Sequence, residues 1–160
     1  MTWPLPETAY VPGLTPRPED SPAFDASAAA PAVTDPEDWQ GNATYLYGFT
    51  LYRAGFFWEA HEVWEPVWMH ARANARERAL MRGLIQLANA CLKLRMERPR
   101  AAIRLAGEAA HYLAEAGSAP LMGLEPHRLA QATSDWADEI ESDLEDALAR
   151  RPDLAPKSAL

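Results

Sequence analysis

Apolar residues recur at intervals of three and four positions along most of the chain, and this spacing predicts amphipathic helices. We find no strand-like alternation and no glycine-rich phosphate loop. The pattern predicts helices over five stretches, at about 35–54, 56–68, 76–95, 99–116 and 125–151. Because the turns between them are short, neighbouring helices should be antiparallel. The sequence therefore predicts an all-α fold, a compact bundle of about five antiparallel helices.

Local signals mark the ends of some of these helices. Asp35 is a suitable N-cap, and Pro36 fits the first helical position after it. Gly55 is a natural helix end, because glycine readily takes the left-handed conformation of a C-cap. Pro66 lacks the N–H that would bond to the Glu62 carbonyl, so we expect a kink or an early helix end there.

The first 34 residues are rich in proline, which fixes φ and removes a backbone donor. Seven prolines fall in this segment: Pro4, Pro6, Pro12, Pro16, Pro18, Pro22 and Pro31. It also carries large apolar side chains that a free linker would not need: Trp3, Leu5, Tyr10, Val11, Leu14 and Phe24. We therefore expect residues 1–34 to form an extended, non-helical arm packed on a helical domain at 35–151, with a C-terminal tail at 152–160. A docking peptide for other proteins is the alternative for this arm.

Composition narrows the classes of function. The chain has 160 residues, a formal charge of -8 and a pI near 5.0, which argues against a nucleic-acid partner. We see neither a signal-peptide pattern nor an apolar run long enough for a membrane span, so we expect a cytoplasmic protein without a membrane partner. Cys91 lies in an apolar helical run and should be a buried, inert thiol. No pattern indicates a cofactor.

The stretch 56–68 combines aromatic and ionisable side chains. It holds three of the six tryptophans, one of the four histidines and three carboxylates. On a helix, one face would carry Phe57, His61, Trp64, Glu65, Trp68 and Arg72. Trp58 and Glu62 would flank this face, and Glu59 would lie opposite. A histidine and a glutamate inside an aromatic stripe predict a polar cluster in a mostly buried place, where polar groups need partners.

The helix predicted at 76–95 offers such partners. Its polar stripe consists of Arg78, Arg82, Gln86, Asn89 and Lys93. Arginine forks and side-chain amides can both bond to carboxylates on a neighbouring helix. The candidate site residues on the two helices are therefore His61, Glu62, Glu65, Arg82, Gln86 and Asn89. We interpret this cluster as non-catalytic, either a buried structural network or a pocket for a small polar ligand.

A metal-dependent hydrolase is a first alternative. His61-Glu62-x-x-Glu65 is similar to the zinc-protease signature H-E-x-x-H, with Glu65 in place of the second histidine. His61 and Glu65 would then hold a metal ion while Glu62 acts as the base. A metal site is not favoured, because the replacement removes a nitrogen ligand, Pro66 disturbs the helix and no third ligand is evident.

Two further alternatives concern metals and assembly. Glu108-x-x-His111 has the spacing of a di-iron carboxylate bundle, but it occurs once where that site type needs it twice. A scaffold protein acting as a homodimer is the other alternative, in which the polar cluster only holds helices together. The acidic side chains near the end of the last predicted helix indicate a solvated face.

Two motifs resemble a known family. Residues 51–65, Leu-Tyr-Arg-Ala-Gly-Phe-Phe-Trp-Glu-Ala-His-Glu-Val-Trp-Glu, and residues 82–90, Arg-Gly-Leu-Ile-Gln-Leu-Ala-Asn-Ala, are similar to the signature of domain of unknown function 309, a family of small bacterial and archaeal proteins. The resemblance covers about residues 45–115. It implies a compact helical fold, an uncharacterised function, and recurrent polar positions at His61, Glu62, Glu65 and Gln86. This chain has Lys93 where members often carry a histidine.

Overall fold

Helices form the regular secondary structure of the protein, which we describe from a computed structural model over residues 2–157. In chain order the elements are α1 (Pro22–Ala28), η1 (Pro36–Gly41), α2 (Ala43–Arg53), α3 (Phe57–Met69), α4 (Arg76–Arg95), α5 (Pro99–Glu115), α6 (Pro126–Ser142) and η2 (Ala147–Arg150). Within residues 2–157 the only β pairing is an isolated bridge between Leu121 and Leu124. The all-α prediction is confirmed.

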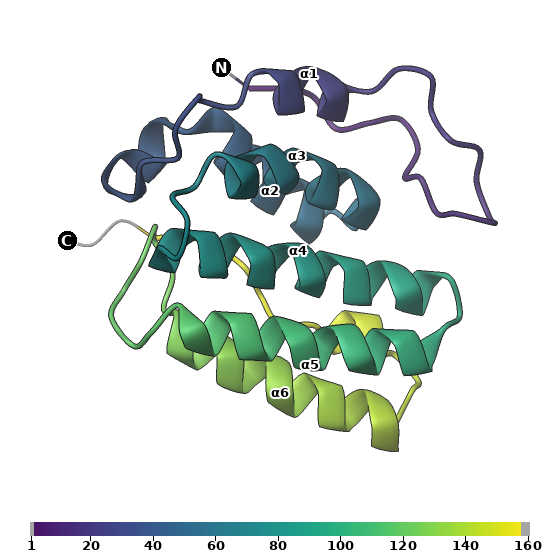
Figure 1. The fold of residues 1–160 in the computed structure, drawn as a ribbon. Coiled ribbons are helices and arrows are strands. Elements are labelled where there is room, and N and C mark those ends of the chain that lie inside the picture. Colours follow the sequence, from purple (N-terminus) through teal and green to yellow (C-terminus); the bar gives the residue numbers. More distant parts are fainter. Residues whose placement is uncertain (1, 158–160) are drawn as a thin grey trace.

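The helices from α2 to α6 pack in chain order, each against the next. Figure 1 shows α4, α5 and α6 side by side with alternating direction, and α2 and α3 next to α4. The short α1 covers the outer side of α3 (Figure 1). Among the described helices, none is long and apolar enough to span a bilayer. In this arrangement α3 lies between the N-terminal arm and the rest of the bundle.

Two of the predicted end signals, those at Asp35 and Gly55, operate as expected. The Asp35 side chain accepts a hydrogen bond from the Glu37 amide and caps η1, which takes the 3-10 form. Asn42 then caps α2 by accepting from the Tyr45 amide. Gly55 has a φ of +88° just after α2, which is the left-handed conformation that glycine tolerates best.

Trp64 fixes how α3 packs on α2. Its side chain is fully buried, and the indole Nε1 donates a hydrogen bond of 3.1 Å to the Tyr45 carbonyl on α2. A Cβ at Gly48 would lie 2.0 Å from that same Nε1 atom. Only glycine therefore lets the indole approach the α2 backbone this closely.

The buried face of α3 is not the one predicted. Glu59, expected on the far side, is fully buried, as are Val63 and Val67, whereas His61 and Glu65 are partly exposed. The helical wheel located the aromatic stripe correctly at Phe57 and Trp64 but not the centre of the buried side. The reason is that the N-terminal arm covers the side of α3 that bears Glu59, and periodicity within α3 carries no information about that cover.

The N-terminal segment contains a helix where none was predicted. Ser21 caps α1 by accepting a hydrogen bond from the Ala23 amide, and Pro22 occupies the first helical position, which needs no N–H donor. The density of prolines masked these helix-start signals. The arm contacts α3 through Tyr10 and through Phe24 of α1, whose ring centroids lie 5.0 and 6.1 Å from that of Trp58.

Pro66 does not end α3, which continues to Met69. The proline leaves the Glu62 carbonyl without its helical donor, and the Ser27 hydroxyl on α1 donates to this carbonyl at 2.9 Å. Thr34 likewise donates from its hydroxyl to the Val67 carbonyl one turn later. The arm thus supplies hydrogen bonds that the sequence of α3 cannot make for itself.

The last helix is shorter than predicted. α6 ends at Ser142, and Leu144, expected inside, is 53% exposed. Acidic side chains at 143, 145 and 146 oppose the negative end of a helix dipole, which disfavours continuation. After this break the Trp136 indole donates to the Ala147 carbonyl and anchors η2. The described part of the tail then packs back, with Leu154 fully buried.

We expect Ser27→Ala to lower the free energy of unfolding by about 1 kcal/mol, because the Glu62 carbonyl loses its donor. Pro66→Ala restores a backbone N–H that can bond to the same carbonyl, so Ser27→Ala should cost less in that background. Denaturant unfolding of wild type, both single variants and the double variant measures the coupling. Equal costs of Ser27→Ala in the two backgrounds would contradict this account.

Glu59 should make stability depend on pH. Its Oε2 accepts from the Tyr10 amide at 2.9 Å, its Oε1 is buried without a partner, and burial raises its pKa above the usual 4.5. The folded state therefore binds more protons than the unfolded state between about pH 4.5 and the raised pKa, and stability falls as pH rises through this window.

Glu59→Gln cannot ionise, so urea unfolding at several pH values should show its stability advantage over wild type growing as pH rises. Glu7→Gln, a change at an exposed carboxylate of the arm, is the matched control and should follow wild type. A pH-independent difference between wild type and Glu59→Gln would sink this explanation.

Candidate functional site

His61, Glu62 and Glu65 converge on one exposed strip of α3. One ligand atom from each residue can be chosen so that all three lie within 4.8 Å of one another. The His61 Nε2 atom is 3.4 Å from Glu65 Oε2, and the Nδ1 atom is 3.9 Å from Glu62 Oε1. The side chains are 23%, 28% and 47% exposed in chain order, so the cluster is open to solvent and is not a buried network, which was one of the two interpretations of the sequence.

The His61 ring is oriented by the backbone of its own helix. Its Nδ1 lies 3.2 Å from the Trp58 carbonyl, close enough to donate a hydrogen bond when the proton is on Nδ1. That tautomer leaves the Nε2 lone pair directed to the side of Glu65. A backbone carbonyl bound to one ring nitrogen is the usual support for a histidine that ligates a metal through the other.

The two carboxylates of the cluster have no arginine or lysine partner in the described part of the chain. Among residues 2–157, the ion pairs of Glu62 and Glu65 are those with His61 alone. Two neighbouring carboxylates repel each other, and a cation between them removes that repulsion. The arrangement therefore favours binding of a positive ion over binding of an anion at this strip.

The other predicted site residues belong to different contacts. Gln86 donates to Glu108 on α5 at 3.0 Å, and Asn89 donates to Gln86 at 3.2 Å. Arg82 lies over the rings of Trp68 and Tyr112. In the described part of the chain, no hydrogen bond or ion pair links these residues to the α3 cluster. The sequence suggested one shared network, because the α4 stripe offers donors that suit carboxylates. In the structure α5 supplies the Glu108 acceptor of Gln86 and one of the two rings beside Arg82.

The Glu-x-x-His motif on α5 does not assemble into a metal-ligand group within residues 2–157. Glu108 pairs with Arg104 and accepts from Gln86, while His111 lies 3.0 Å from Glu115 on an exposed surface. Each residue of the motif is thus engaged with a separate neighbour. The di-iron alternative has no second carboxylate pair at this place.

Cys91 is fully buried, as predicted, and burial raises the pKa of its thiol to about 12. Its Sγ lies 4.0 Å from the Tyr52 hydroxyl. A thiol with so high a pKa remains protonated at neutral pH and is a poor nucleophile. Cys91 is therefore not a candidate nucleophile.

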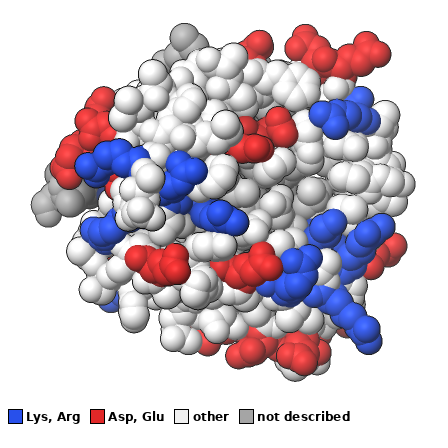
Figure 2. All heavy atoms as spheres, viewed as in Figure 1, with Lys and Arg blue, Asp and Glu red and all other residues white. Residues whose placement is uncertain are grey.

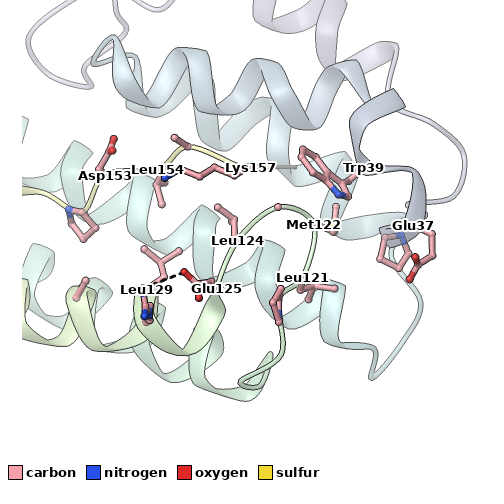
Figure 3. Close-up of a pocket in the computed structure, with 17 residues that line it drawn as sticks. Glu37, Trp39, Leu121, Met122, Leu124, Glu125, Leu129, Asp153, Leu154 and Lys157 are labelled. Atoms are coloured by element: carbon pink, nitrogen blue, oxygen red, sulfur yellow. Dashed lines mark ion pairs between the residues drawn. The ribbon is translucent and has the colours of Figure 1, made fainter. Parts of the chain in front are cut away.

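A hollow of about 680 Å³ lies on another side of the molecule, between η1, the 120–125 loop, the start of α6 and the C-terminal segment. Figure 3 shows Trp39, Leu121, Met122, Leu124 and Leu154 around it, with Glu37, Asp153 and Lys157 among the charged residues. No motif in the sequence indicates this hollow, because η1 lies about 80 residues before the other segments that form its walls.

Residues 45–105 match the model of the family described as Domain of unknown function (DUF309). This range runs from α2 into α5, ten residues short of the extent expected from the motifs, and it includes the α3 cluster and the polar stripe of α4. The N-terminal arm and α6 lie outside it. No curated protein and no solved structure matches the chain. The segment from α2 to the first turns of α5 therefore matches the DUF309 family, as the motifs predicted.

Proposed function

We propose that this protein binds a divalent transition-metal ion through His61, Glu62 and Glu65. The observation that carries the proposal is the 3.4 Å separation of His61 Nε2 and Glu65 Oε2. Two ligand atoms each about 2.1 Å from a tetrahedral ion lie about 3.4 Å apart, so both atoms can bind one ion with little rearrangement. Glu62 completes a set of one nitrogen and two carboxylate ligands.

The ligand types indicate which ions fit. One imidazole and two carboxylates suit Zn²⁺, Mn²⁺ or Fe²⁺, whereas Mg²⁺ and Ca²⁺ prefer oxygen ligands alone. Two carboxylates also balance the charge of a divalent ion, since neither has a lysine or arginine partner in the described chain. Three ligands from one helix leave other coordination positions to water or to a small molecule.

The exposure of the three side chains supports ligation more than a purely structural role. A buried network would make Glu65→Ala cost about 2–4 kcal/mol, since a partner would remain unpaired. Glu65 is 47% exposed, so its substitution should change stability by no more than about 0.5 kcal/mol in metal-free protein. Variants at this strip should therefore fold and report on binding alone.

We expect metal-free wild type to bind Zn²⁺ close to one ion per chain and to gain about 2.7 kcal/mol of stability at a hundredfold excess over Kd. His61→Gln and Glu65→Gln should lose both the binding and the stabilisation. Isothermal titration calorimetry and thermal unfolding, each with and without Zn²⁺, measure the two effects.

The matched control is the double variant His111→Gln/Glu115→Gln. It removes an i, i+4 His–Glu pair that is 3.0 Å apart and exposed, but that lacks a third ligand. This variant should bind Zn²⁺ as wild type does. Retained stoichiometric binding in His61→Gln, or no binding in wild type, would refute the proposal.

A further inference from the structure

A hollow at the start of α4 gathers positive charge in an otherwise acidic chain. It has a volume of about 660 Å³ and lies between the end of α3, the first turns of α4 and the end of α5. Three arginines line it, Arg76, Arg78 and Arg82, together with the rings of Trp68 and Tyr112. Figure 2 shows basic side chains gathered over the start of α4 on this face.

Two of these arginines are held in place by neutral groups. Arg76 donates to two backbone carbonyls just beyond the end of α5. Arg78 donates to carbonyls at the end of α3, and its guanidinium carbon lies 4.5 Å from the Trp68 ring centroid. Carbonyl acceptors position a guanidinium without cancelling its charge. Glu115, the one carboxylate in the lining, pairs with His111 instead.

Unlike Arg76 and Arg78, Arg82 does not cap the carbonyls at a helix end. Its guanidinium carbon lies 5.7 Å from the Trp68 ring centroid and 4.8 Å from that of Tyr112. Within residues 2–157 Arg82 makes these ring contacts and no hydrogen bond or ion pair, and its side chain is exposed. The rings stabilise the cation and restrict its motion, while its N–H donors stay available to a ligand.

We propose that this hollow binds a small organic phosphomonoester. Three preplaced guanidinium groups without carboxylate partners match a doubly charged oxyanion, because arginine forks pair with phosphate oxygens in a bidentate way. Trp68, Tyr112 and the methyl groups of Ala73, Ala75 and Ala79 give the organic part an apolar wall. The volume is in the range of small-molecule sites, about 300–1,000 Å³. None of the residues of the cation site proposed on α3, His61, Glu62 and Glu65, lines this hollow.

Phosphate and phenyl phosphate serve as probes, titrated into chelator-treated full-length protein so that a metal on α3 cannot bind them. The indole N–H signal of Trp68 and the arginine side-chain signals, followed by NMR, report binding. Phenyl phosphate should bind more tightly than phosphate, and Arg82→Gln should weaken both by about tenfold, the loss of one charge-assisted contact. Arg100→Gln, the same change at an exposed arginine of α5, should leave both affinities unchanged.

Each other outcome counts against the proposal. Absence of binding at millimolar probe would overturn it. Equal weakening by Arg82→Gln and Arg100→Gln would assign the effect to diffuse charge. Equal affinity for the two probes would overturn the organic-ester part and leave a site for free oxyanion. Circular dichroism of each variant confirms that the exposed substitutions leave the fold intact.

Discussion

The contact of Trp64 with Gly48 sets the rotation of α3, and the rest of the structure depends on that rotation. The indole reaches the α2 backbone only because position 48 has no Cβ, and its N–H bonds to the Tyr45 carbonyl there. Because Trp64 faces α2, the directions in which the other side chains of α3 point are fixed as well. The Glu59 side then needs a cover, and the strip with His61, Glu62 and Glu65 is left facing solvent.

The N-terminal arm is the cover that this rotation requires. It meets the Trp58 ring with two aromatic side chains, donates a backbone hydrogen bond to Glu59 and supplies the donor that Pro66 removed from α3. The proline in α3 and the serine in α1 are thus complementary features 39 positions apart in the chain. Because Glu59 retains an unpartnered oxygen, the arm is docked over a group whose charge weakens the folded state.

Two sets of uncompensated charge follow from the same packing. Carboxylates on α3 have no arginine partner, while arginines at the start of α4 bond to carbonyls and rings instead of carboxylates. Net charge alone gave no sign of this, since a total of -8 is also typical of a soluble surface. Separate clusters of opposite sign on neighbouring helices support two binding sites of different chemistry.

Local sequence determined most of the helices and some of their ends, because capping and helical periodicity act within a few residues: Asp35 caps η1, Gly55 follows α2, and α4 carries the predicted polar stripe. Local sequence also contained the residue types of both candidate sites. Which of these residues meet was decided by tertiary structure. Gln86 donates a hydrogen bond to Glu108 on α5, Arg82 lies over two aromatic rings, and Glu59 accepts a hydrogen bond from the arm. A helical wheel ranks faces by composition, whereas burial depends on which distant segment covers each face, and for α3 that segment was a proline-rich arm with no periodic signal of its own.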